Sequence, residues 1–187
     1  AQLYFPTERQ RTTMIQTEQR RLSKRATSIN EAVTLAIAAE AKRMQAAGIP
    51  VISLSTGEPD FPTPQRIKQA AFDAINQNFT KYTQAEGIPE LRNVVAEKFT
   101  TENGIPTEAH QVLVSSGGKH CLFNALAAIV DDGDEVLIPS PYWTSYPEMV
   151  TLVGGVPVLV EASYESGYRI TPDQLRAAIT PRTRAMI

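Results

Sequence analysis

The chain has 187 residues, of which 42% are hydrophobic, and a formal net charge of −2 at pH 7. This content can bury a substantial core, and the near balance of charges gives no reason to expect nucleic acid or an anionic membrane as the main partner. No apolar run reaches the roughly 18 residues of a membrane span, and one cysteine, Cys121, excludes an internal disulfide framework. We therefore expect a soluble protein from a reducing compartment.

The first 28 residues differ in composition from the rest of the chain. They are rich in glutamine and threonine, and their five arginines outnumber two glutamates, so no buried face can be drawn through them. We interpret this segment as an N-terminal arm, disordered or in contact with a partner. An Arg-rich, acid-poor leader is also typical of a transit peptide, so a plastid or other organelle stays open beside the cytoplasm.

Three helices are expected before residue 105, because apolar residues recur there at helical spacing. The first runs from a plausible cap at Asn30 to a stop signal at Gly48. Thr63 and Pro64 have the character of a cap and a first helical position for the second helix. The third begins near Pro89.

Strands and helices alternate in the remainder of the chain. Each apolar run of strand length is followed by a segment of helical period, which is the signature of a parallel sheet covered by helices on both sides. A further short strand is expected in "VISLSTG", residues 51–57. The alternating elements are strand 112–116, helix 118–130, strand 135–138, helix 142–153, strand 156–160, helix 172–179 and a strand from Arg184.

The stretch "LVSSGGKHCLFNAL", residues 113–126, reads as a strand that runs through two glycines into a helix. The backbone amides of Gly118 and Lys119 would lie at the helix N-terminus, where an anion, most often a phosphate, is stabilised. The stretch does not match a nucleotide P-loop, since Leu113 replaces the first glycine of that motif and His120 replaces its Ser or Thr. It does not match a dinucleotide-binding fingerprint either, because Lys119 occupies a position where that motif needs glycine. A plain tight turn remains the alternative.

Trp143 lies in "SPYWTSYPEM", directly after strand 135–138. Ligands of open parallel sheets bind at the carboxyl ends of the strands, so we expect Tyr142 and Trp143 to open on the same edge as the turn at Gly117. A tryptophan there can stack on a planar heteroaromatic ring, although an ordinary core or interface position is the alternative. The two features together favour a phosphorylated aromatic cofactor.

Other polar residues give weaker indications. His110 and His120 have no neighbours at metal-ligand spacing, so we interpret them as surface or helix-start residues and expect no metal. Cys121, just inside a helix, is expected to be a small buried apolar residue. The acidic run "DDGDE", residues 131–135, is expected to end one helix and turn the chain into the next strand.

Five segments now carry a family resemblance. They occur in the order and spacing of class I aminotransferases that use pyridoxal 5'-phosphate, and the run resembles the bacterial-type aspartate aminotransferase subgroup over about residues 25–187. Five segments in order are far more specific than any one of them. The segments are "SLSTGEPDFPTP", "TKYTQAEGIPELR", "SSGGKHCLFNAL", "DDGDEVLIPSPYWTSYPEMV" and "ITPRTRAMI".

The resemblance implies roles for individual residues. Trp143 matches the tryptophan that stacks on the pyridine ring and that can contact the substrate, and Tyr82 matches the tyrosine that reaches the cofactor phosphate of the neighbouring subunit. Gly57 matches a glycine whose backbone meets the substrate carboxylate. Seen alone, Tyr82 would be a surface loop aromatic and Gly57 a plain turn residue. The family's cofactor-phosphate turn corresponds to Gly117, Gly118 and Lys119.

The resemblance also implies the fold and its division. The fold class is α/β, with the parallel-sheet-centred, three-layer large domain of the pyridoxal-phosphate transferase (aspartate aminotransferase-like) fold, incomplete at its C-terminus. Residues 1–28 would be the N-terminal arm, 29–60 the first part of the small domain, and 61–187 the first part of the cofactor-binding large domain. A homodimer with shared active sites is expected, without nucleic acid or membrane partners.

The implied function is transfer of an amino group between an amino acid, aspartate or glutamate, and a 2-oxo acid. The family's catalytic lysine would lie beyond Ile187, none of the six lysines present matches it, and residues 1–187 alone are expected to be inactive. A glutamate/aspartate-prephenate aminotransferase stays open, as do lyases and synthases of this fold. A non-enzymatic regulator would need an upstream helix-turn-helix, for which residues 1–28 are too short and too polar.

Overall fold

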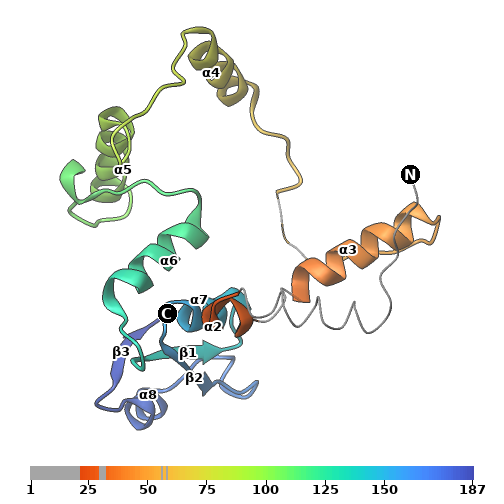
Figure 1. Ribbon diagram of the computed structural model, residues 1–187, viewed down its shortest axis with the longest axis vertical. Helices are drawn as coiled ribbons and strands as arrows, with labels where there is room; N and C mark the ends of the chain where they lie inside the picture. The colour runs from red at the N-terminus through yellow and green to blue at the C-terminus, as the bar shows by residue number, and fades with distance from the viewer. Residues whose placement is uncertain (1–21, 30–32, 56, 58) are drawn as a thin grey trace, which may run out of the picture. The chain divides into compact units, whose positions relative to one another are not determined.

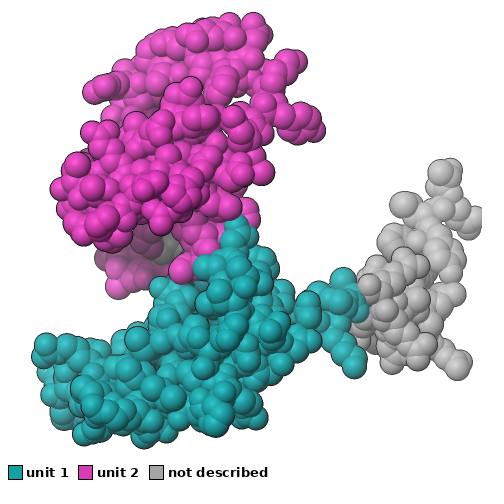
Figure 2. Space-filling model, turned by 90° about the vertical axis from the view of Figure 1, so that its left-hand side faces the viewer, with its two compact units in different colours: residues 1–37, 123–187 teal, residues 38–122 magenta. Residues whose placement is uncertain are grey.

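The computed structural model describes residues 22–29, 33–55, 57 and 59–187. The described residues fall into two compact units (Figure 2). Unit 1 comprises residues 123–187 and the described residues before 38, and unit 2 comprises the described residues of 38–122. Most of the predicted arm and the predicted cap Asn30 lie outside the described residues. The predicted division into arm, small domain and large domain stays a prediction.

Three parallel strands form the sheet of unit 1, in the order β2-β1-β3 (Figure 1). They are β1 (Glu135–Ser140), β2 (Val156–Glu161) and β3 (Thr183–Met186). β1 and β2 pair in unbroken register, whereas the pairing of β1 with β3 shifts between Glu135 and Val136. The predicted parallel sheet is confirmed.

β1 is the centre of the core because it is buried on both faces. Val136, Leu137 and Ile138 are at most 1% exposed, and a continuous apolar run of this kind is typical of a strand covered on both sides. α7 (Ser145–Leu152) connects β1 to β2, and α8 (Pro172–Ala178) connects β2 to β3. Crossovers between parallel strands are right-handed, so the step out to β2 and back past β1 puts the two helices on opposite faces, as Figure 1 shows.

The acidic run before β1 is a turn, as predicted. α6 (Gly118–Ile129) ends just before it. The Asp131 N–H donates to Asp134 Oδ2 at 3.0 Å, and the Asp134 N–H donates to the Asp131 carbonyl at 3.1 Å. The Gly133 N–H donates to the Gly154 carbonyl at 3.0 Å, which fixes the start of β1 beside the start of β2. α2 (Lys24–Thr27) packs against α7 in this unit.

The predicted helices of unit 2 are present. α3 (Val33–Ala46) leads into it, and it contains α4 (Gln65–Asn76), α5 (Pro89–Thr101) and the short 3₁₀ helix η1 (Ala109–Gln111). α5 packs on η1 and buries Ala96. No helix in the described part of the chain is both long and apolar enough to cross a membrane.

Two predicted strands are wrong. Residues 51–54 have no strand structure, and Ile52 and Leu54 are at least 90% exposed. Residues 112–116 are not a strand either, although Val112 has an extended backbone. A strand exists only through a ladder of hydrogen bonds to a neighbour, and in the described residues neither segment has such a ladder.

Two predicted helix starts are shifted. Pro64, expected as the first helical residue, is the N-cap of α4, and no side chain caps that helix. α7 begins at Ser145 and not at residue 142. Pro147 explains the second shift, because a proline has no N–H to donate and fits only in the first turn of a helix.

Candidate functional site

The glycine turn at the start of α6 is built by its own backbone. Gly117 has φ +87°, a conformation that favours glycine. Its N–H donates to the Ser115 carbonyl at 2.8 Å, and its carbonyl accepts from the N–H groups of His120 and Cys121 at 3.1 and 3.2 Å. Gly117 is therefore the N-cap of the helix, and Gly118 is the first helical residue.

The first N–H groups of a helix, here beginning at Gly118, point away from the helix body toward its N-terminal end. Residues 116–121 are all exposed, and no atom lies within 4 Å of a Cβ built at Gly117 or Gly118. The space beside this backbone is open, and the N-terminal end of the 12-residue helix carries a partial positive charge. This arrangement fits a bound anion such as a phosphate group.

The loop that carries Tyr82 is joined to the segment before the turn. The Val114 N–H donates to the Glu86 carbonyl at 2.9 Å. Gly87, at φ +107°, approaches so closely that a Cβ there would lie 2.7 Å from Val114 Cγ2. Tyr82 itself is fully exposed and lines a shallow hollow of 280 Å³ with Lys81 and Thr80.

Arg92 holds the same segment from the α5 side, a role that the sequence analysis missed. Its half-buried side chain donates from Nε to the carbonyls of Ala109 and Val112, at 3.1 and 3.0 Å. The available indication was its place on α5 between the apolar residues Leu91 and Val95. Arg92 thereby fixes the backbone that leads into the glycine turn.

Trp143 belongs to the other unit and follows the carboxyl end of β1, as predicted. Its ring is 42% exposed and meets Tyr146 edge to face, with centroids 5.5 Å apart and planes at 83°. The Ala162 N–H donates to the Ser140 carbonyl at 3.2 Å, which joins the carboxyl ends of β1 and β2 beside it. A partly exposed indole at this edge can stack on a planar ring.

The structure does not test the remaining site predictions. Gly57 is exposed, with no atom within 4 Å of a Cβ built there. The glycine turn and Tyr82 lie in one unit and Trp143 in the other. That Trp143 and the turn open on one edge of the sheet therefore stays a prediction, as do the individual binding roles.

Cys121 is exposed, so its predicted burial is wrong. The side of α6 that packs carries Leu122 and Leu126, and Cys121 lies with Ala125 on the uncovered side. His110 is an exposed residue at 3.2 Å from a Glu108 carboxylate oxygen. In the described residues, no cluster of histidine, cysteine and acidic side chains could hold a metal ion.

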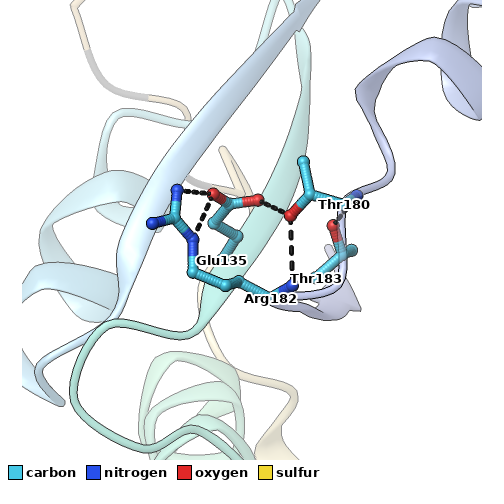
Figure 3. A network of polar contacts seen from close by, with 4 residues as sticks. All are labelled: Glu135, Thr180, Arg182 and Thr183. Atoms are coloured by element: carbon cyan, nitrogen blue, oxygen red, sulfur yellow. Dashed lines mark hydrogen bonds and ion pairs between the residues drawn. The ribbon is translucent and has the colours of Figure 1, made fainter.

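A buried carboxylate at the start of β1 was also missed (Figure 3). Glu135 is 4% exposed, and it accepts from Thr180 Oγ1 at 2.6 Å and from Arg182 Nε at 2.9 Å, with a second contact to Arg182 Nη2. The Thr180 hydrogen bond and then the Arg182 guanidinium hold the pKa of this carboxyl below its usual range. The network joins β1 to the loop before β3 and is structural.

The sheet topology and the glycine turn define an α/β protein, and comparison with known proteins identifies the family. The sequence model of "Aminotransferase class I and II" matches residues 49–187. The chain belongs to this family, and its fold is the α/β pyridoxal-phosphate transferase fold.

Individual relatives agree with this assignment. The chain is 49% identical over 167 residues to an aspartate aminotransferase of Geobacillus stearothermophilus, covering 89% of this chain and 42% of the relative. It is 54% identical over 154 residues to an aspartate/prephenate aminotransferase of Cereibacter sphaeroides, covering 82% and 38%. A solved aspartate aminotransferase of Thermus thermophilus with maleate superposes with a TM-score of 0.85 at 47% identity, covering 88% and 43%. The chain thus spans less than half the length of these relatives.

Proposed function

We propose that the full-length protein is an aminotransferase that uses pyridoxal 5'-phosphate to move an amino group between an amino acid and a 2-oxo acid. The observation that carries this proposal is the glycine turn at the start of α6, where Gly118 and Lys119 are exposed residues, inside the region that matches the family. The turn fits a phosphate group, and the exposed Trp143 ring fits an aromatic one.

The chain's own residues would hold and orient the reactants. The turn binds the phosphate through backbone N–H groups, and Trp143 covers one face of the pyridine ring. The backbone at Gly57 meets the substrate carboxylate, and Tyr82 reaches the phosphate in the partner subunit of a homodimer. The bound cofactor supplies an electron sink for the bonds at the amino acid's α-carbon.

Aspartate with 2-oxoglutarate is the leading substrate pair, since relatives named aspartate aminotransferase match over 89% of the chain. Transfer to prephenate from glutamate or aspartate is the second candidate, favoured by the 54% identity to the aspartate/prephenate enzyme. Initial rates with 2-oxoglutarate and with prephenate as amino acceptor separate the two. We expect the cytoplasm as the location, with an organelle as the alternative.

The test is spectroscopic and kinetic. Pyridoxal 5'-phosphate is titrated into the apo form of the full-length protein, and oxaloacetate formation from aspartate is then followed. Saturable binding and turnover are expected, with no turnover by residues 1–187 alone, because none of their lysines matches the catalytic one. A full-length protein that binds no cofactor, or that binds it and transfers no amino group between any of these substrates, refutes the proposal.

A further inference from the structure

The glycine turn contains one side-chain hydrogen bond that the proposed function does not use. The N–H of Ser116 donates to Nδ1 of His120 at 3.2 Å. The next N–H, that of Gly117, donates to the Ser115 carbonyl. Two consecutive amides of the turn are thus satisfied within the turn itself. The two amides that follow them are the helical ones that the proposed function assigns to the phosphate.

His120 is the third residue of α6. At this position of a capping box, a Glu or Gln side chain accepts from the N–H of the N-cap residue, whereas His120 accepts from Ser116, one residue before the N-cap Gly117. A glutamate at this position would place a negative charge beside the proposed phosphate and repel it. An imidazole that accepts through Nδ1 satisfies the Ser116 amide without an anion.

We propose that His120 is a positioning residue of the cofactor-phosphate site: its Nδ1 accepts from the Ser116 N–H, fixes that amide and so aims the following amides at the phosphate. This inference rests on the proposed function, since it concerns the phosphate half of the same cofactor. His120 acts through the backbone and need not touch the cofactor. Its contribution is therefore confined to ligands that carry the phosphate.

Three variants of the full-length protein isolate this contribution. His120→Asn keeps a neutral acceptor, because Oδ1 lies as many bonds from Cα as Nδ1 does. His120→Asp keeps the acceptor and adds a negative charge, and His120→Leu removes the acceptor. His110→Leu, at an exposed histidine outside the turn, is the matched control. Dissociation constants of the apo-proteins are measured for pyridoxal 5'-phosphate and for pyridoxal, which lacks the phosphate, together with apo melting temperatures.

We expect His120→Leu to weaken pyridoxal 5'-phosphate binding about fivefold, the equivalent of one neutral hydrogen bond, and to leave pyridoxal binding unchanged. His120→Asn should bind like wild type. His120→Asp should bind the phosphate ligand about tenfold more weakly than His120→Asn, with a gap that shrinks at high salt. His110→Leu should match wild type for both ligands.

The failures are distinguishable. A wild type that binds neither ligand refutes the proposed function. A wild type that binds pyridoxal 5'-phosphate while His120→Leu binds it equally well, or loses both ligands equally, overturns the role of His120. If His120→Leu does not fold, the Asn and Asp variants decide, and equal phosphate-ligand affinity of those two overturns the argument from charge.

Discussion

Gly87→Ala tests the contact between the Tyr82 loop and the segment before the glycine turn. Gly87 has φ +107°, and a Cβ there would lie 2.7 Å from Val114 Cγ2 and 2.9 Å from Val114 Cβ. The backbone conformation costs a non-glycine residue about 1–2 kcal/mol. Forcing a methyl group against Val114 costs a further 1–3 kcal/mol or so. We therefore expect about 2–5 kcal/mol of destabilisation.

Two further variants separate the backbone cost of Gly87→Ala from its steric cost. Gly48 also has a positive φ, +78°, but no atom lies within 4 Å of a Cβ built there, so Gly48→Ala reports the backbone cost alone. Val114→Ala removes the Cγ2 atom that a Cβ at residue 87 would meet, but it keeps Val114 Cβ, at 2.9 Å. In a double-mutant cycle with Gly87→Ala it should therefore recover a part of the steric cost of about 1–3 kcal/mol and leave the backbone cost unchanged.

The assay is denaturant unfolding of the apo full-length protein at constant m-value, followed by titration with pyridoxal 5'-phosphate. Because the contact lies three residues before Gly117, Gly87→Ala should also weaken cofactor binding more than Gly48→Ala does. Equal destabilisation by the two glycine variants, or no recovery in the double mutant, would show that the close approach to Val114 does not constrain this loop.

The remaining predictions concern Trp143, Glu135, Leu137 and the assembly. Trp143→Ala should weaken cofactor binding about tenfold while the apo melting temperature stays near wild type; a normal affinity with a much lower melting point would make it a core residue. Because its pKa is lowered in the folded state, Glu135 contributes stability that is present above the ordinary glutamate pKa of about 4.3 and is lost as pH falls through the folded-state value. Glu135→Gln should make the free energy of unfolding depend less on pH in the acid range, and an unchanged pH dependence would contradict this role of Glu135. Leu137→Ala, at a side chain 1% exposed, should cost about 2–5 kcal/mol of unfolding free energy, and a loss below 1 kcal/mol or so would mean that β1 is not the core. Light scattering should give a dimer at working concentration, and a fully active monomer would defeat the shared-site proposal.

Elements whose pattern is local were predictable from the sequence. α5 starts at Pro89 and α6 at Gly118 because proline and glycine impose their own backbone preferences there. The apolar run of β1 indicated a buried strand without knowledge of its neighbours. By contrast, residues 51–54 and 112–116 have strand-like composition, but pairing is decided by distant segments, which no window of sequence contains.

In the candidate site, too, features set by neighbouring residues were predictable and features set by distant residues were not. The turn at Gly117 was predictable because its chemistry lies in consecutive residues. The bonds from Arg92 to the carbonyls of Ala109 and Val112 span 17 and 20 residues, and the contact of Glu135 with Thr180 spans 45. Such contacts depend on the folded backbone, and only the identity of the side chain is visible beforehand. The exposure of Cys121 depends likewise on which side of α6 finds a neighbour.

The central position of β1 sets the timing of its burial during synthesis. β2 follows it within about 20 residues, but the second neighbour, β3, begins 48 residues after Glu135. At roughly 5–20 residues per second, the ribosome needs about 2 to 10 s to make that interval. During this time the apolar run Val136–Ile138 belongs to a nascent chain with one unpaired strand edge. We expect nascent-chain chaperones to bind there until β3 has been synthesised.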